Sequence, residues 1–117
     1  MLPAPNRLRE RSDFTSAVRS FGGCRAGSRL LVVHATSTGA RAGLPPRVGF
    51  VVSKAVGGAV VRNRTKRRLR ALVAQRLDGI PTSVDLVVRA NPPAGQASSR
   101  ELEQALDPLL RRVVKGL

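Results

Sequence analysis

Six of the nine residues from Arg62 to Arg70 are basic, and none of the nine is acidic. The surrounding segment, residues 57–77, has apolar residues spaced three and four apart, which is typical of an amphipathic helix. On such a helix, like charges at that spacing repel each other at a cost of about 0.2–0.5 kcal/mol a pair. A fold that keeps this segment helical must pack one side of it on a core and leave the basic side for an external anion.

Rotating the helix by about 100° per residue separates its two sides. The side expected to face the core carries mostly apolar residues: Val61, Thr65, Leu69, Leu72 and Val73. The opposite side carries basic residues, one amide and two small residues: Asn63, Arg64, Arg67, Arg70, Ala71 and Ala74. Arg62 and Lys66 border this side on one edge, and Arg68 borders it on the other. A solvated helix normally carries acidic residues among its basic ones, so this side favours binding to a polyanion.

The charge of the whole chain agrees with this interpretation. Its 117 residues include 21 Lys and Arg against 7 Asp and Glu, which gives a formal net charge of +14. Between Asp13 and Asp78 the chain has thirteen basic residues and no acidic one. Internal ion pairs cannot neutralise that excess, and proteins with such an excess commonly bind a polyanion.

A membrane surface is another polyanion to consider. The longest apolar runs are far shorter than the roughly 20 residues that a membrane-spanning helix needs. The first residues, MLPAPNRLRERSDF, lack the apolar core of a secretory signal. The single cysteine, Cys24, can form no intramolecular disulfide, which agrees with a reducing compartment. We therefore expect a cytoplasmic protein that does not bind a membrane.

Helix and strand signals alternate along the chain. We expect helices over Ser12–Ser20, Ala59–Leu77 and Ser99–Val114, and strands over Leu30–Ala35, Val48–Ser53 and Val84–Ala90. This order, α, β, β, α, β, α, predicts an α+β fold in which helices cover a small central sheet. The first two strands are expected to form an antiparallel pair, and Pro108 to kink or shorten the last helix. No linker divides the chain, so residues 1–117 are predicted to form one domain, ordered from about residue 5 to residue 114.

Lys54 and two glycines, Gly57 and Gly58, precede the basic helix. Glycines at a helix N-terminus let backbone amides approach a phosphate, with the helix dipole behind them. They could equally serve only to make the turn from strand to helix. No Gly-Lys-Ser/Thr follows them, so the segment is not a nucleotide-binding P-loop.

RNA fits the basic helix better than DNA does. One cysteine and one histidine cannot form a zinc finger, and no helix-turn-helix pattern precedes the helix. A densely basic helix with a single Asn is better suited to gripping a phosphate backbone than to reading a base sequence. We therefore expect the partner to be a structured RNA.

Two segments of the chain resemble one known family. The run Val52–Arg70, VSKAVGGAVVRNRTKRRLR, is similar to the Arg-Asn-Arg signature of the protein subunit of bacterial ribonuclease P. The segment Asn6–Phe14, NRLRERSDF, resembles the opening motif of the same family. The resemblance implies an α-β sandwich with the order of elements given above. It also implies a left-handed βαβ crossover around the basic helix, which general handedness rules would not predict.

The resemblance further implies a function and a set of site residues. The protein would assist a catalytic RNA that removes the 5′ leader of precursor tRNA, using Mg²⁺ bound mainly by the RNA. The residues that match contacts to the catalytic RNA are Lys54, Arg62, Asn63, Arg64, Lys66, Arg67, Arg68 and Arg70. A cleft beside the first helix would hold the single-stranded leader, and the residues on or beside it are Arg7, Leu8, Arg9, Phe14, Val18 and His34.

Val18 and His34 depart from the family pattern, which often has aromatic residues at these positions. Stacking of an unpaired base on an aromatic side chain is worth about 1–3 kcal/mol, so this chain is expected to hold the leader more by charge and shape. His34 could also be a packed or edge histidine of its strand. Both interpretations of His34 stay open.

Two other classes of function remain to be distinguished. The alternative is a basic ribosomal protein, or another structural RNA-binding protein, with a related fold. A third class is a nuclease in its own right, but the chain shows no paired carboxylates suited to acid–base chemistry. We assign no catalytic residue and no metal site to the protein, and we expect no protein partner.

Overall fold

The computed structural model describes residue 6, residues 23–37 and residues 42–117. The helix expected over Ser12–Ser20 lies outside these residues, as do five predicted cleft residues: Arg7, Leu8, Arg9, Phe14 and Val18. The strands are β1 (Cys24–Gly27), β2 (Leu31–Ser37), β3 (Arg47–Val51) and β4 (Val84–Ala90). The helices are α2 (Ala59–Ala74) and α3 (Ser99–Gly116), and the short 3-10 turns are η3 (Lys54–Val56), η4 (Leu77–Gly79) and η5 (Pro92–Gln96).

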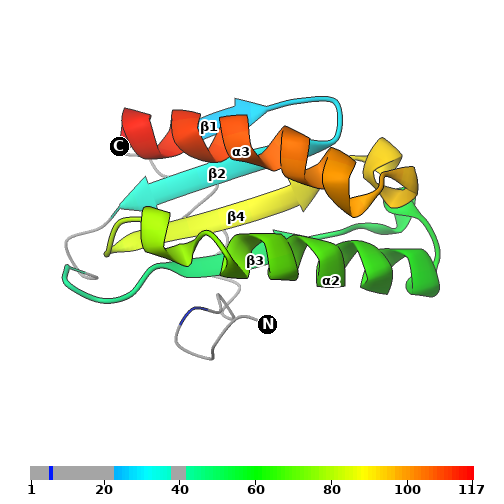
Figure 1. The fold of residues 1–117 in the computed structure, drawn as a ribbon, viewed down its shortest axis with the longest axis horizontal. Coiled ribbons are helices and arrows are strands. Elements are labelled where there is room, and N and C mark those ends of the chain that lie inside the picture. The colour runs from blue at the N-terminus through cyan, green and yellow to red at the C-terminus, as the bar shows by residue number, and fades with distance from the viewer. Residues whose placement is uncertain (1–5, 7–22, 38–41) are drawn as a thin grey trace.

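The four strands form one sheet in the order β1-β2-β4-β3 (Figure 1). β2 is antiparallel to β1 and to β4, and β3 is parallel to β4. The expected antiparallel pairing of the second and third of these strands is wrong, because β4 lies between them. Their connection is too long for a tight hairpin turn and contains Pro45 and Pro46. The chain instead leaves β3 through α2 and returns in parallel as β4; the hand of this crossover stays a prediction.

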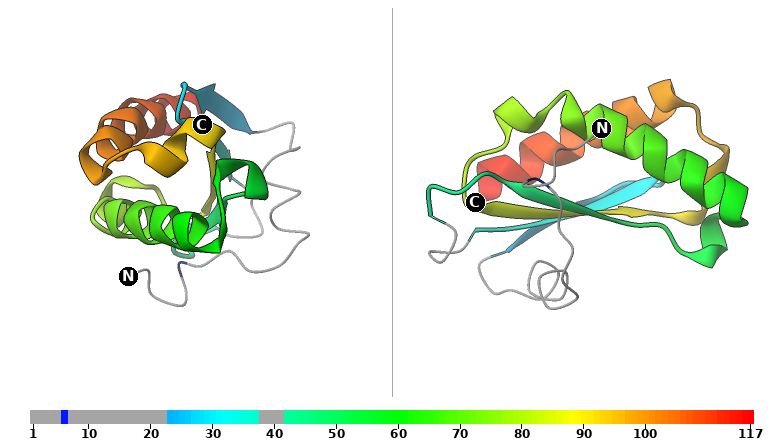
Figure 2. Two further views of the ribbon diagram at one scale, coloured as in Figure 1. Left: turned by 90° about the vertical axis from the view of Figure 1, so that its right-hand side faces the viewer. Right: turned by 90° about the horizontal axis from the view of Figure 1, so that it is seen from below.

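Two helices, α2 and α3, lie side by side over one face of the sheet (Figures 1 and 2). Side chains alternate between the two faces of a strand, and on β2 and β4 the residues under the helices are buried: Leu31, Val33, Ala35, Leu86 and Val88. The helices cover them with apolar side chains: Leu69 and Val73 of α2, and Leu102, Leu106, Leu109 and Val113 of α3. Full burial of one such side chain contributes about 1.5–3 kcal/mol. The predicted α+β fold is confirmed, and this core fixes the orientation of α2.

α3 begins with a capping box and continues through a proline. Ser98 Oγ accepts a hydrogen bond from the amide of Glu101 at 3.1 Å, and the Glu101 carboxylate accepts one from the amide of Ser98 at 3.0 Å. Pro108 does not shorten the helix, which runs on to Gly116, and the expected alternative, a kink, stays a prediction. Pro108 removes one backbone donor, but apolar side chains before and after it are buried on the sheet, and this packing holds the helix together.

In the part of the chain that the structure describes, neither helix is both long and apolar enough to cross a membrane.

Candidate nucleic-acid interface

The packing of α2 decides which of its basic side chains face outward. Thr65, Leu69, Leu72 and Val73 are buried and Val61 is half-buried, as the apolar spacing predicts. α2 begins at Ala59 as expected, but it ends at Ala74 because the chain turns there toward η4. The exposed side chains on the opposite side are Asn63, Arg67, Arg70 and Ala71. Together with the exposed Lys54 of η3, the polar ones among them form what we call the outward surface: Lys54, Asn63, Arg67 and Arg70.

Two arginines of α2 turn toward the protein instead. Arg64 Nη2 donates a hydrogen bond to the carbonyl oxygen of Gly95 at 3.0 Å, and Arg68 Nη1 donates one to that of Ala97 at 2.7 Å. Both arginines are half-buried. The expectation that Arg64 lies with Arg67 on the outward side is therefore wrong. An arginine side chain is long enough to reach these carbonyl oxygens, and such charge-assisted hydrogen bonds are strong.

The remaining predicted basic residues occupy the border of the helix. Arg62 and Lys66 are both half-buried. Among the described residues, the Nε atoms of Arg62 and Arg64 are buried without a hydrogen-bond partner. The heads of these two arginines are thus partly withdrawn from water, whereas Arg67 and Arg70 are open to it.

The two glycines before α2 have different surroundings. A Cβ atom on Gly57 would lie 2.8 Å from Cβ of Val61, so close packing of the turn requires glycine there. Gly58 is the N-cap of α2, and a Cβ atom on it would meet nothing within 4 Å. Gly57 therefore fits the interpretation as a strand-to-helix turn, while Gly58 leaves the first amides of α2 without a capping side chain.

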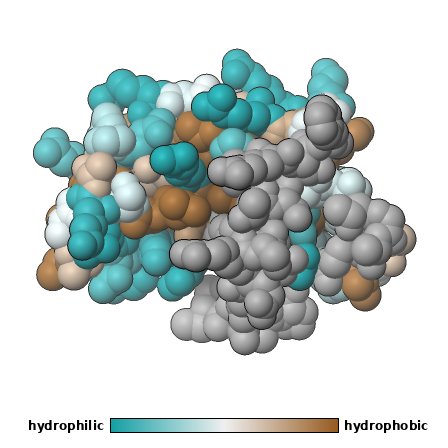
Figure 3. Space-filling view, turned by 180° about the vertical axis from the view of Figure 1, so that it is seen from behind, coloured by the Kyte–Doolittle hydropathy of each residue, from teal (hydrophilic) through white to brown (hydrophobic). Residues whose placement is uncertain are grey.

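A groove lies on the sheet face that is turned away from the helices. Arg25 of β1 stands opposite His34 of β2. Arg89 of β4 stands opposite Val32 of β2, so it is a diagonal neighbour of His34. The groove has a volume of about 570 Å³, and its lining includes these three ionisable side chains and residues in or next to η3 and η5: Arg25, His34, Arg89, Ser53, Ala55, Asn91 and Pro92. Figure 3 views the molecule from this side and shows apolar surface bordered by hydrophilic side chains.

The groove is electropositive. Burial lowers the pKa of His34 below its usual 6.5, and the positive charges of Arg25 and Arg89 lower it further. The described carboxylate on this sheet face, Asp85, accepts hydrogen bonds from Arg47 at 2.9 and 2.7 Å. The groove can thus offer two guanidinium groups and an imidazole to an anion.

His34 was the one predicted cleft residue that the structure describes, and it lies in this groove. Sequence reasoning missed Arg25, Arg89, Ser53 and Asn91. Alternation along the strands could have found Arg89, because it is two residues from Val87, the partner of His34. Arg25 could not be found in this way, since the short strand β1 was not expected.

The sole histidine of the chain makes the electrostatics of the groove testable. We expect the imidazole of His34 in the free protein to titrate below pH 6.5, and Arg89→Ala to raise its pKa by removing a nearby positive charge. Because the folded protein binds fewer protons here than the unfolded chain, His34 lowers stability as the pH falls below about 6.5. The measurement is the ring proton shift of His34 by NMR against pH. A wild-type pKa at or above 6.5 would contradict this prediction, and Arg112→Ala on α3 is the control.

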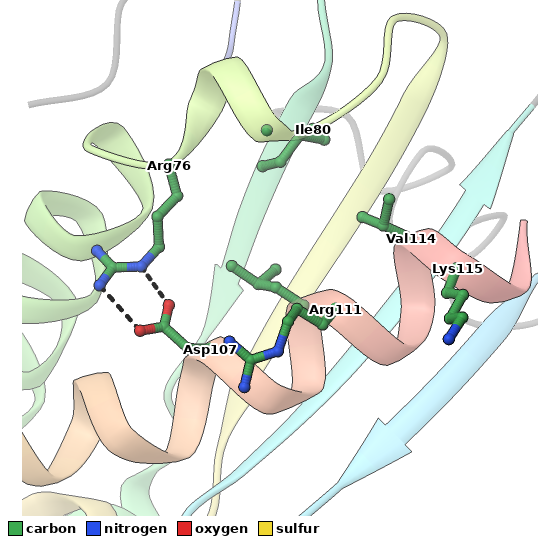
Figure 4. Close-up of a pocket in the computed structure, with 8 residues that line it drawn as sticks. Arg76, Ile80, Asp107, Arg111, Val114 and Lys115 are labelled. Atoms are coloured by element: carbon green, nitrogen blue, oxygen red, sulfur yellow. Dashed lines mark hydrogen bonds and ion pairs between the residues drawn. The ribbon is translucent and has the colours of Figure 1, made fainter.

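A second hollow lies on the helical side of the molecule, between η4 and the C-terminal half of α3. Figure 4 shows Arg76, after the end of α2, reaching across to Asp107 of α3. Arg76 also donates to Glu103 at 2.6 Å and to the carbonyl of Leu72 at 2.8 Å. These contacts raise the pKa of Arg76 above its ordinary value and lower that of Asp107. The hollow of about 530 Å³ is lined in part by Ile80, which packs beside this junction of the two helices.

The ion pair between Arg76 and Asp107 predicts an acid-sensitive stability. Asp107 has a lowered pKa in the folded protein, so its contribution is present at neutral pH and is lost as the pH falls below about 4. Solvent screens the pair, so we expect Asp107→Asn to lower the Tm at pH 7 by only about 2–5 °C. Thermal unfolding of both proteins from pH 7 to pH 3 should show this difference shrinking. A difference that stays constant over this range would contradict the assignment.

No three His, Cys, Asp or Glu side chains of the described residues gather closely enough to hold a metal ion. The candidate features for binding an anion are the outward surface and the groove.

These features define a class of protein: a small, strongly basic α+β protein with a basic crossover helix and a basic groove on its sheet. The sequence model of the family described as Ribonuclease P matches residues 2–114. The chain belongs to the ribonuclease P protein family, whose members are subunits of an endoribonuclease.

Individual relatives agree over nearly the whole chain. The ribonuclease P protein component of Streptomyces bikiniensis is 52% identical over 99% of this chain and 98% of its own length. That of Beutenbergia cavernae is 56% identical over 92% of this chain and 87% of its own length. The solved RNase P protein of Staphylococcus aureus has a TM-score of 0.80 at 26% identity, covering 93% of this chain and 97% of that one. For the Thermotoga maritima protein the TM-score is 0.73 at 25% identity, covering 93% and 96%.

Proposed function

We propose that this chain is the RNA-binding subunit of ribonuclease P. Through the outward surface it binds the catalytic RNA, and through the groove it binds the 5′ leader of precursor tRNA. The observation that carries this proposal is the outward surface itself, where Arg67 and Arg70 are exposed on a helix without a single acidic residue. A phosphate backbone supplies the counter-charge that the protein does not supply there.

The protein acts by electrostatics and by positioning. Guanidinium groups on α2 lower the repulsion between phosphates that the folded RNA brings close together, which favours its compact form. The hydrolysis itself belongs to the RNA, with Mg²⁺ held mainly by RNA oxygens, where the ion stabilises developing negative charge. We assign no catalytic residue to the protein.

The groove suits a single-stranded leader. Arg25 and Arg89 offer charge to its phosphates, and unpaired bases can stack on an imidazole or a guanidinium. With the imidazole of His34 at a position that is often aromatic in the family, most of the grip comes from charge. A leader contact would extend the substrate interface beyond the tRNA body and so lower the KM for precursor tRNA.

One reconstitution experiment tests this function. The protein is added to its cognate catalytic RNA at low Mg²⁺, and cleavage of precursor tRNA is followed. We expect faster cleavage at the mature 5′ end, because the protein replaces part of the charge screening that Mg²⁺ otherwise provides. A basic ribosomal protein would leave the rate unchanged, and a nuclease in its own right would cleave without the RNA. Either result would contradict the proposal. A cytoplasmic location and a single domain over residues 1–117 stay predictions.

A further inference from the structure

The inward turn of Arg64 and Arg68 distinguishes them from the other basic residues of α2. They lie one helical turn apart and donate to the carbonyl oxygens of Gly95 and Ala97, at the end of η5 and just after it. We call these two contacts the clasp. A side chain that only gripped phosphate would be expected to stay exposed to solvent, as Arg67 is. The clasp instead engages one nitrogen of each guanidinium in the protein and leaves the positive charge in place.

η5 is also held from its other side. A Cβ atom on Gly95 would collide with the carbonyl oxygen of Val56 in η3 and would lie 3.0 Å from Cγ1 of Val61 in α2. Glycine is therefore required where η5 wedges between η3 and the first turn of α2. The clasp closes this wedge, so η5 cannot move away from α2 without breaking it.

The same turn begins in the groove. Asn91 and Pro92 line the groove, and Ser53 and Ala55, on either side of Lys54, line it as well. The side-chain amide of Asn91 donates to the carbonyl oxygen of Ser28 at 3.0 Å, and its backbone N–H donates to the carbonyl oxygen of Leu30 at 2.8 Å. η5 thus connects two places: its first residues stand at the groove, and its last residues are gripped by α2.

We propose that Arg64 and Arg68 are positioning residues that hold η5 against α2 and thereby set the shape of the leader groove. The effect on the leader groove rests on the proposed function above. The helix that presents the outward surface to the catalytic RNA then also shapes the groove on the opposite face of the sheet. Binding of RNA at either place favours the same arrangement of η3, η5 and α2, so the two binding events support each other.

Lysine substitutions separate this role from simple phosphate binding. Lysine keeps the positive charge of arginine but lacks its planar fork and its reach. If Arg64 only gripped phosphate, Arg64→Lys would resemble its matched control, Arg67→Lys, with a modest loss of RNA affinity. If Arg64 holds η5, then Arg64→Lys opens the clasp with no change in net charge.

The first measurement uses the free protein and needs no RNA. The amides of Ala94 and Ala97 donate to the carbonyls of Asn91 and Ala94, so their hydrogen exchange reports opening of η5. We expect this exchange to be about 5–10-fold faster in Arg64→Lys and Arg68→Lys, while Arg67→Lys leaves it unchanged. The ring signal of His34 should also shift in the first two variants only. Exchange that is the same in all variants would overturn the proposal.

The second measurement uses the holoenzyme at protein concentrations that saturate the catalytic RNA. We compare kcat/KM for precursor tRNA with a leader and for a substrate shortened to one leader nucleotide. Arg64→Lys should lower the ratio of the two values about 5-fold or more, whereas Arg67→Lys should leave it unchanged and only raise the Kd for the RNA. A lower Tm with an unchanged ratio would show a merely structural role and overturn the proposal.

A charge-neutral variant supplies an independent arm. Gly95→Ala pushes η5 from η3 and changes no charged residue, so it should lower the same ratio while the salt dependence of RNA binding stays as in the wild type. A normal ratio in folded Gly95→Ala protein would contradict the proposal. If Gly95→Ala does not fold, the Arg64→Lys and Arg68→Lys variants alone test the proposal. If the wild-type protein fails to stimulate the RNA, the proposed function is wrong, and the exchange experiment alone still decides whether the clasp holds η5.

Discussion

Reversing the charge of Arg67 and Arg70 together should lower the affinity for the catalytic RNA at least about 100-fold, because each charge-assisted hydrogen bond to phosphate is worth about 1.5–3 kcal/mol. Both side chains are exposed on α2 and lie away from the core, so the double variant Arg67→Glu, Arg70→Glu should remain folded. Binding is measured by titrating the RNA with protein at several salt concentrations. The slope of log affinity against log salt should fall by roughly two, one for each lost phosphate contact.

The control for this variant keeps the same change in net charge. Arg111→Glu with Arg112→Glu alters two exposed arginines of α3, on the helical layer but outside the outward surface. If the whole-molecule charge governed binding, both double variants would weaken it equally. Equal losses would contradict the assignment of the RNA contact to α2.

Arg89→Glu should impair cleavage of precursor tRNA with a long 5′ leader and spare a substrate whose leader is a single nucleotide. Arg89 is exposed and lines the groove, and its replacement puts a negative charge beside His34 where a phosphate would lie. Losing one charge-assisted contact and adding repulsion should lower kcat/KM for leader-bearing precursor tRNA about 10-fold or more. The affinity for the catalytic RNA, measured without precursor tRNA, should stay within about twofold of the wild-type value, because Arg89 lies outside the outward surface and takes no part in the clasp.

The comparison that decides this prediction is made with saturating protein. A substrate shortened to one leader nucleotide should be cleaved at nearly the wild-type rate by Arg89→Glu, and Arg112→Glu should behave as the wild type with both substrates. Impairment that is equal with the long leader and with the single-nucleotide leader would contradict the assignment of the leader to the groove.

The register of α2 was predictable from sequence, whereas the direction of Arg64 was not. Thr65, Leu69 and Val73 recur at helical spacing, and their burial fixes which side of α2 faces the sheet. Helical spacing places Arg64 on the side away from the core, and its partner carbonyl at Gly95 is thirty-one residues away in the sequence. No periodicity encodes such a contact, because it depends on where η5 comes to rest.

The arrangement of the sheet limited prediction of the groove in the same way. Strand signals locate β2, β3 and β4 but do not say which strands are neighbours, and the hairpin rule favoured the wrong pair. The cleft residues expected from the resemblance lie mostly outside the described part of the chain. The groove becomes visible only when the register places Arg25 opposite His34 and Arg89 on the adjacent strand.

The central strand of the sheet is also the last strand to be synthesised. β4 lies between β2 and β3, so on a ribosome these two strands have no common neighbour until residues 84–90 have emerged from the exit tunnel. Contacts between segments so far apart in sequence form late and slow the folding of a domain. We therefore expect nascent chains from which β4 has not yet emerged to stay protease-sensitive, because the sheet under α2 is still incomplete. Emergence of β4 then completes the sheet and fixes the basic segment 62–70 on it.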